Sequence, residues 1–535
     1  MHGIKNTSFF PRRDTAASLC LILLSLLVIG ITVLPFLILC RYNHPGDNDN
    51  WWIFRTFLDK KGPTITLATL FSLRGTFNFA NLFFFPLYNH PEGMTEELFA
   101  TFLSTYHLSA AFYVLLFWLA ASVLYVSLNR SVFHFKGSRS FFLYALFLYL
   151  LFNAVHHPTM AFYDLVSSSG YNAGLSYLFF FISFSLLHYV SEGKRRIPYG
   201  IACVLFFMAC IFSMEYYPFV CGCISFAIIL YDACGKRRPN IMHALFLVIC
   251  IAVFFRNFYV VRKLVMPDVD GYVGKYTGGS DSGITLAMTL GSMLQSLREN
   301  GIRYFRQLIT RRCYLPVTAL LAVSAARKLH RNGMKLPLWA VLPFFLIILG
   351  ICAIFSFSTP DLFVMPRYAW TPFVLLFLFI LALLVSIALL LLQAFDRALA
   401  ADRTGDFLQV REGFAAVRRI CRNRAQDTRK LLACTAACML LFSWCALKDA
   451  NTCVATAWKD ILKGEAAAFD QEMTDRYAAI FAAEQGEAVY LVPILHRPKS
   501  LFVRDSMEFE TDRVTVRQFF DNDGIYFKVG ELILR

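Results

Sequence analysis

The sequence predicts an all-α polytopic membrane protein with about eleven membrane-spanning helices and a small external α/β domain at its C-terminus. Apolar residues make up 57% of the 535 positions, charged residues only 16%, and the mean hydropathy is +0.54. Soluble domains are closer to half apolar and a quarter charged. Apolar stretches of roughly 17–25 residues, enough to cross a bilayer as a helix, recur along the chain. Basic residues also fall in alternate connections between these stretches.

The first apolar stretch, Ala16–Cys40, is too long for the core of a signal peptide. Arg41 and Tyr42 follow it, where a signal peptide would have a small-residue cleavage site, so we interpret it as an uncleaved first helix. Apolar length and periodicity predict helices near residues 16–40, 107–128, 140–155, 172–191, 198–213, 217–231, 242–256, 313–327, 337–357, 370–394 and 431–447.

The basic residues predict the orientation of these helices, because short cytoplasmic connections carry an excess of Lys and Arg. The segment Asp396–Lys430 alone holds eight arginines and one lysine. With the N-terminus in the cytoplasm, the C-terminus lies outside and the other cytoplasmic clusters are Lys5/Arg12/Arg13, Arg130/Lys136/Arg139, Lys194–Arg196, Lys236–Arg238 and Arg327/Lys328/Arg331/Lys335. We therefore expect a multi-pass protein of the bacterial cytoplasmic (inner) membrane.

One basic group, between Arg298 and Arg312, falls in a connection that should be external. An additional span at 284–297 would bring this group inside but would place the basic segment 396–430 outside. That arrangement departs further from the rule that basic residues are cytoplasmic. Long translocated loops largely escape the charge rule. We therefore keep eleven spans and expect 284–310 to form an amphipathic helix at the outer interface.

This topology predicts a transmembrane domain over 1–447 with external loops 41–106 and 257–312, followed by a small extracytoplasmic domain over 448–535. Within the latter, Trp458–Gln485 has helical periodicity and Ala488–Pro493 has the pattern of a short buried strand. The domain is small enough that we expect it to depend on the membrane domain for its fold.

Several classes of function find no support in the sequence. Most of the 15 cysteines lie inside apolar runs, where a thiol behaves as a small hydrophobic group, and no metal site is predicted. The chain has no Walker A loop, no dinucleotide-binding glycine motif and no nucleophile elbow. The net charge of +15 is concentrated in the cytoplasmic connections, which favours anionic lipid over nucleic acid as the partner.

The first external loop opens with two carboxylates, Asp47 and Asp49, followed by the aromatic pair Trp51-Trp52. A membrane enzyme that acts on a lipid-linked substrate needs a carboxylate at this depth, to deprotonate an acceptor hydroxyl or to hold a metal. The alternative is a solvated Asx turn anchored at the interface by tryptophan.

Other polar residues fall at the same predicted face. Glu215 lies between two helices that almost no loop separates, and an ionisable group at membrane depth is a candidate for function. The alternative to a functional role is that the short hairpin exposes Glu215 to outside water. The remaining candidates near the outer helix ends are His156, His157, Asp164 and Asn172. Adjacent histidines point in different directions on a helix, which argues against a metal held by His156 and His157.

Arg367 follows a proline at the external start of a late helix, where a guanidinium can bind a phosphate with two hydrogen bonds. Arg303 and Arg306 of the interfacial segment are candidates for the same phosphate. The commoner role of such arginines is to reach a lipid headgroup.

Taken in order, these features resemble the GT-C superfamily of membrane glycosyltransferases, and more closely a bacterial family of glucosyltransferase-like polytopic proteins of unknown function. The resemblance covers nearly the whole chain through short motifs. They are Asp47/Asp49, Phe162–Tyr163 with Ser169–Asn172, Met214–Tyr216, Pro366–Arg367 and Arg513–Ile525. The chain departs from the pattern at Asn48, which interrupts the acidic pair, and at Met214, which replaces a polar residue.

The resemblance implies transfer of a sugar from a polyprenyl-phosphate donor to an envelope glycan on the external face. Asp47, Asp49 and Glu215 would then be catalytic, and Arg367 would face the departing phosphate. The sequence assigns no cofactor, and a divalent cation held by the carboxylates stays open. The alternatives are a lipid-linked glycan flippase or other transporter, which would need polar residues through the membrane midplane, and a non-catalytic protein of envelope assembly.

Overall fold

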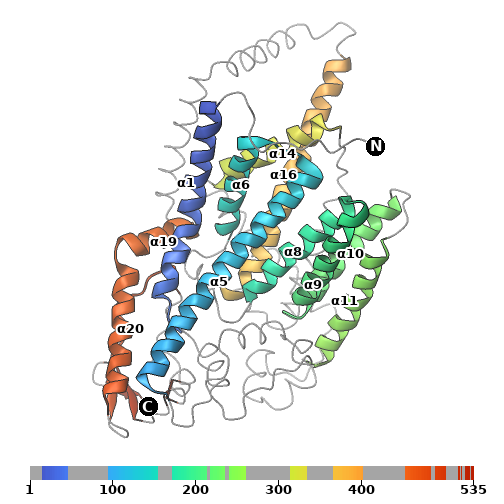
Figure 1. Cartoon of the computed structure of the whole chain (residues 1–535). Helices are drawn as coiled ribbons and strands as arrows, with labels where there is room; N and C mark the ends of the chain where they lie inside the picture. Colours follow the sequence, from blue (N-terminus) through green and yellow to red (C-terminus); the bar gives the residue numbers. More distant parts are fainter. Residues whose placement is uncertain are drawn as a thin grey trace.

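The computed structural model describes residues 15–45, 94–154, 171–213, 217–234, 240–260, 314–333, 366–401, 452–483, 488–501, 516–517, 520, 524–529 and 532–534. Over these ranges the chain is mainly helical (Figure 1). The helices are α1 (Thr15–Leu39), α5 (Glu96–Leu128), α6 (Gly137–Phe152), α8 (Tyr171–Val190), α9 (Arg196–Ile211), α10 (Tyr217–Cys234), α11 (Ile241–Val260), α14 (Tyr314–Arg331), α16 (Pro366–Ala401), α19 (Cys453–Leu462) and α20 (Glu465–Ala482).

Several of these helices have the character of membrane spans. Three are long and apolar enough to cross a membrane: Ser18–Tyr42, Glu96–Phe133 and Ala173–Val190. Shorter apolar helices accompany them at Gly137–Phe152, Tyr217–Ala233, Ile241–Arg256 and Ile380–Ala394. The predicted helical membrane character is therefore confirmed. The helices predicted near 337–357 and 431–447 lie outside the described residues.

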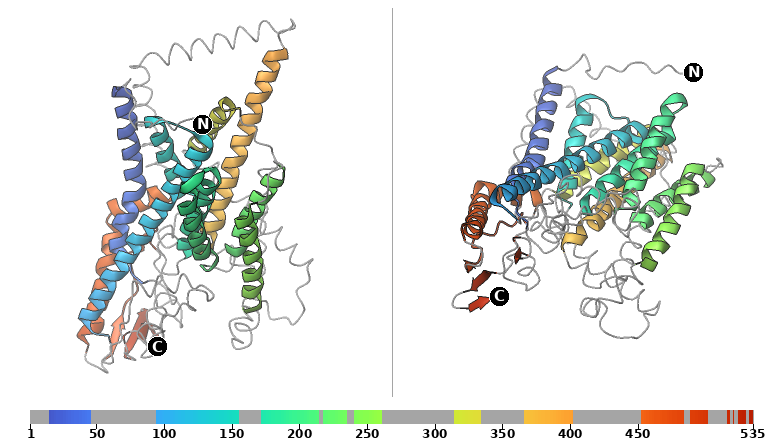
Figure 2. Two further views of the ribbon diagram at one scale, coloured as in Figure 1. Left: turned by 45° about the vertical axis from the view of Figure 1, so that its right-hand side comes forward. Right: turned by 60° about the horizontal axis from the view of Figure 1, so that its bottom comes forward.

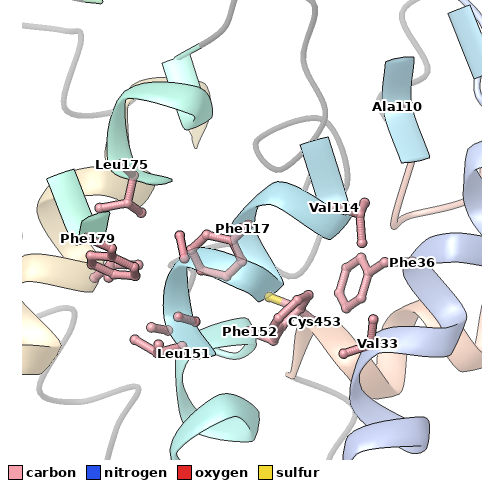
Figure 3. Close-up of a cluster of buried hydrophobic side chains, with 14 of the residues drawn as sticks. Val33, Phe36, Ala110, Val114, Phe117, Leu151, Phe152, Leu175, Phe179 and Cys453 are labelled. Atoms are coloured by element: carbon pink, nitrogen blue, oxygen red, sulfur yellow. The ribbon is translucent and has the colours of Figure 1, made fainter. Parts of the chain in front are cut away.

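The core is built from large apolar side chains of α1, α5, α6 and α8 (Figure 3). Phe152 of α6 contacts Phe36 of α1 at 5.4 Å between ring centroids and Phe117 of α5 at 5.1 Å. Phe117 in turn lies 5.9 Å from Phe179 of α8. Cys453, the first residue of α19, is fully buried in the same cluster. The C-terminal region thus enters the core of the helical bundle.

Helix α5 begins at Glu96, which corrects the predicted start near residue 107 and makes part of the expected external loop 41–106 helical. Thr95 caps the helix, because its Oγ1 accepts a hydrogen bond from Leu98 N at 3.2 Å. The additional turns are amphipathic rather than continuously apolar, so apolar length did not reveal them. Their buried side chains, Phe99, Phe102 and Tyr106, lie on one helical face.

The C-terminal region contains two helices and a sheet. The helix expected over Trp458–Gln485 is divided at Gly464, which has φ of 76° and separates α19 from α20. Glycine adopts this left-handed conformation without steric cost. The predicted strand is present as β1 (Val489–Leu491), which pairs in parallel with β2 (Ile525–Val529), and β2 pairs antiparallel with β3 (Leu532–Leu534). Strands β2 and β3 were not predicted from the sequence.

These C-terminal elements lie at one end of the long helices α1 and α5 (Figures 1 and 2). Helix α19 packs along α1, and α20 contacts the short turn Cys40–Tyr42 that follows α1. The segment after β1 folds back onto α20, where Glu472 accepts hydrogen bonds from the backbone N–H groups of Leu495 at 3.0 Å and His496 at 3.2 Å.

Candidate functional site

Asp47 and Asp49 follow the end of α1 in the sequence. The 3₁₀ turn Cys40–Tyr42 follows α1, and Asn43 is extended, with φ of −88° and ψ of 125°. The described chain continues to Pro45. Asp47, Asp49 and Trp51 lie outside the described residues. The structure describes the residues just before them, Asn43–Pro45, which we call the loop root.

That root is held by hydrogen bonds from two other parts of the chain. His107 of α5 contacts the Asn43 carbonyl at 2.9 Å through Nε2, which is therefore the protonated nitrogen of its ring. His44 contacts Asp470 of α20, with 2.9 Å between Nε2 and Oδ1. The His44 side chain is fully buried, whereas that of Asp470 is 30% exposed. A residue that follows α1 is thereby joined to α20, near the other end of the chain.

Tyr477 of α20 completes the arrangement around His44. Its hydroxyl lies 3.4 Å from His44 Nδ1. Burial raises the pKa of Tyr477 well above its ordinary value, so its hydroxyl keeps its proton. The consistent assignment is that Tyr477 donates to Nδ1 of His44, while Nε2–H of His44 donates to Asp470. Asp470, His44 and Tyr477 form a hydrogen-bonded chain that orients the imidazole at the loop root.

Aromatic packing encloses this chain. The His44 ring lies 5.5 Å from Phe469 and 6.0 Å from His107, both edge to face. Tyr477 packs 4.5 Å from Phe99, at the start of α5. Helix α20 presents these residues because its buried side chains recur at helical spacing, as Ala466, Phe469, Met473, Tyr477 and Ile480.

A second junction lies at the N-terminal ends of α8 and α10. Gly174 of α8 is so close to α10 that a Cβ there would lie 2.2 Å from Tyr217 Cε2 and 2.7 Å from Ser213 Oγ. Asn172 lies two residues before Gly174, and Glu215 lies between Ser213 and Tyr217 in the sequence. The ends of the segments that carry these two candidates are therefore adjacent.

A third junction joins the C-terminal end of α6 to the start of α19. The Asn153 side chain accepts a hydrogen bond from Val454 N at 3.1 Å and donates one to Tyr149 O at 2.9 Å. Asn153 is fully buried. Its amide satisfies a backbone donor at the start of α19 that has no partner within the helix. The predicted candidates His156 and His157 follow three and four residues later, outside the described range.

The structure leaves the side chains of the predicted site residues undescribed. Asn172 lies on α8 and Arg367 on α16, where only the backbone is described. The other candidates lie outside the described residues: Asp47, Asp49, Trp51, His156, His157, Asp164, Glu215, Arg303 and Arg306. Among the described residues, no group of three or more His, Cys, Asp or Glu side chains is placed to hold a metal ion.

Four residues of this arrangement were not predicted from the sequence: His44, His107, Asp470 and Tyr477. His44 lies only three residues before Asp47, which is the local signal that could have drawn attention to it. Its partner Asp470 lies 426 positions away, and no sequence pattern links the two. Comparison with known proteins does not add a relative, since no family profile, no curated protein and no solved structure matches this chain.

Proposed function

We propose that this chain is a GT-C-type glycosyltransferase that moves a sugar from a polyprenyl-phosphate donor to a cell-envelope glycan at the outer face of the bacterial inner membrane. The proposal includes eleven spans, a cytoplasmic N-terminus and an extracytoplasmic C-terminal domain. The observation that carries it is the buried attachment of the loop root at His44. A loop with two carboxylates that starts from a fixed point at the end of an apolar helix is suited to work at headgroup depth.

The chemistry follows from the residue types. Asp47 or Asp49 takes the proton from an acceptor hydroxyl as that oxygen attacks the anomeric carbon. The bond from the anomeric carbon to the phosphate oxygen breaks, and the electron pair leaves on the polyprenyl phosphate. Arg367, with Arg303 or Arg306, stabilises that negative charge.

The remaining candidates bind the two substrates. Glu215 orients sugar hydroxyls or acts as a second acidic group in catalysis. Asn172 binds the sugar from the adjacent helix end, with Asp164 and the pair His156-His157 at the same face. Trp51 lies beside the prenyl chain. A lipid-phosphate donor is consistent with a chain that has no nucleotide-binding loop.

The test uses membranes that contain the full chain, supplied with a polyprenyl-phosphate-linked sugar and an envelope glycan acceptor. We expect Asp47→Asn with Asp49→Asn to abolish transfer at normal protein levels, because general-base catalysis typically contributes 10²–10⁴-fold. Asp475→Asn, which removes an exposed carboxylate of α20, is the matched control. Full transfer by the double variant would overturn the assignment. Movement of the lipid-linked sugar across sealed vesicles without covalent transfer would instead identify a transporter.

A further inference from the structure

A groove lies on the helical bundle at the ends of α8 and α9, the opposite ends from the junction of α8 with α10. Its volume is about 490 Å³, within the range of clefts that hold small ligands. The last turn of α8, the turn Gly193–Arg195, the first turns of α9 and the start of α11 line it. Helix α9 contacts both α8 and α11 (Figure 1).

The walls of the groove are apolar and face outward. Ile197, Ile201, Val204 and Leu205 recur along one face of α9, and all of them are exposed, with Ile197 at 64% and Leu205 at 63%. Gly200 leaves the floor open, and a Cβ there would lie 3.2 Å from the His188 ring. An exposed apolar surface of this kind is suited to contact acyl chains.

The mouth of the groove is polar and cationic. Arg196 Nε donates to His188 Nε2 at 3.3 Å, and His188 Nδ1 donates to the Arg196 carbonyl at 3.0 Å. These two bonds orient the Arg196 side chain at the mouth, and among the described residues its terminal N–H groups have no other partner. The exposed Lys194 and Arg195 do not line the groove, but they belong to the turn Gly193–Arg195, which reaches it at Gly193. With Glu192 as the acidic neighbour, the chain beside the mouth carries a net positive charge.

We propose that this groove binds a diacyl anionic phospholipid, with its phosphate at Lys194–Arg196 and one acyl chain along α9. From Arg196 to Leu205 the helix rises about 14 Å at 1.5 Å per residue. That length is close to one leaflet of a hydrocarbon core about 30 Å thick. It fits an acyl chain better than a much longer prenyl chain. Basic pockets between membrane helices bind anionic headgroups in this way.

The site is separate from the proposed glycosyl transfer, and its test needs no catalytic activity. The full chain in detergent is titrated with phosphatidylglycerol and with phosphatidylcholine of the same acyl chains, and retained lipid is measured by native mass spectrometry. We expect the wild type to prefer phosphatidylglycerol and Arg196→Gln to weaken its binding about five-fold. That loss corresponds to roughly 1 kcal/mol for one basic residue at an anionic headgroup.

Two further variants separate this site from general attraction to the membrane. Val204→Trp fills the groove without touching Arg196 and should lower retention of phosphatidylglycerol, whereas Leu119→Trp on the exposed face of α5 should not. Arg130→Gln is the charge control, because Arg130 donates to Tyr199 at 3.4 Å and does not line the groove.

Equal losses for Arg130→Gln and Arg196→Gln, or unchanged retention in Val204→Trp, would overturn the proposal. Displacement of phosphatidylglycerol by an equimolar polyprenyl phosphate would overturn the assignment to a phospholipid.

Discussion

Trp458 donates a hydrogen bond from Nε1 to the Ile31 carbonyl, with 2.8 Å between the two atoms. Ile31 lies four positions before Pro35, inside α1. Proline has no N–H, so it cannot donate to the carbonyl four residues earlier, as other helical residues do. Trp458 of α19 therefore supplies the partner that the α1 backbone lacks. Backbone carbonyls away from water are rarely left without a partner, so this bond favours docking of α19 at this point of α1.

The first prediction concerns this bond. Trp458→Phe keeps a large aromatic ring but removes the donor, so the Ile31 carbonyl loses its partner. We expect a loss of about 1–3 kcal/mol in the free energy of unfolding. Thermal unfolding of the purified chain in detergent, followed by circular dichroism, measures it.

The control for this prediction is the background Pro35→Ala, in which residue 35 regains an N–H that can donate to Ile31. Trp458→Phe should cost less in that background than in the wild type. An equal cost in both backgrounds would show that the hydrogen bond does not compensate for Pro35.

The second prediction concerns the attachment of the chain just before Asp47 and Asp49, the proposed catalytic residues. Asp470→Asn removes the charge of a 30% exposed carboxylate beside the buried His44, but it leaves an amide oxygen that can accept from His44 Nε2. Hydrogen bonds to charged groups contribute about 1.5–3 kcal/mol, against about 0.5–1.5 kcal/mol for neutral ones. We therefore expect a lower thermal stability and a slower rate of the proposed glycosyl transfer, because the root of the segment that carries Asp47 and Asp49 is held less firmly.

Asp475→Asn is again the matched variant, since Asp475 lies on the exposed part of the same helix and accepts from Gln471 at 2.8 Å. Transfer measured beside thermal stability separates the two effects. Unchanged transfer in Asp470→Asn would contradict a positioning role for the His44–Asp470 pair.

The third prediction concerns the close approach of α8 and α10. Gly174→Ala places a Cβ 2.2 Å from Tyr217, so the helices must move apart, at a cost of about 1–3 kcal/mol. Gly30→Ala in α1 meets nothing within 4 Å and should be neutral or favourable, since alanine is the better helix former. Thermal unfolding of the two variants compares them, and equal stability would contradict the packing.

The fourth prediction concerns a buried carboxylate of α19. Burial raises the pKa of Asp460 above its ordinary value, although two hydrogen bonds from Ser500, both 2.6 Å long, oppose the shift. The folded state then holds the proton more tightly than the unfolded state. Asp460 therefore favours folding most at low pH, and this contribution is lost as the pH rises through the folded-state pKa.

The measurement is the free energy of unfolding of wild type and Asp460→Asn across a pH series that begins below the ordinary aspartate pKa of 3.8. The free energy of unfolding of the wild type minus that of Asp460→Asn should fall with rising pH, by at most about 1.4 kcal/mol per pH unit. A difference that rises with pH would show that the Ser500 hydrogen bonds outweigh burial.

Some features of the candidate site were within reach of the sequence, and others were not. The polar residues at the ends of apolar helices were recognisable, because a charge next to a hydrophobic stretch is costly unless it has a role. The adjacency of Gly174 and Tyr217 was not, because a glycine in an apolar helix does not reveal which helix packs against it. The tether of His44 was likewise invisible, because its partners Asp470 and Tyr477 lie on a helix near the other end of the chain.

The sequence by itself determined the helical membrane character and the positions of most described helices, because apolar length and 3.6-residue periodicity are local properties. Tertiary structure alone decided two features: the docking of α19 on α1 and the pairing of His44 with Asp470. Each of these features depends on a segment far away in the sequence, which covers an apolar face or supplies the hydrogen-bond partner of a polar group. Pro35 illustrates the difference, because the sequence shows that a carbonyl loses its donor, whereas only the fold shows that Trp458 replaces it.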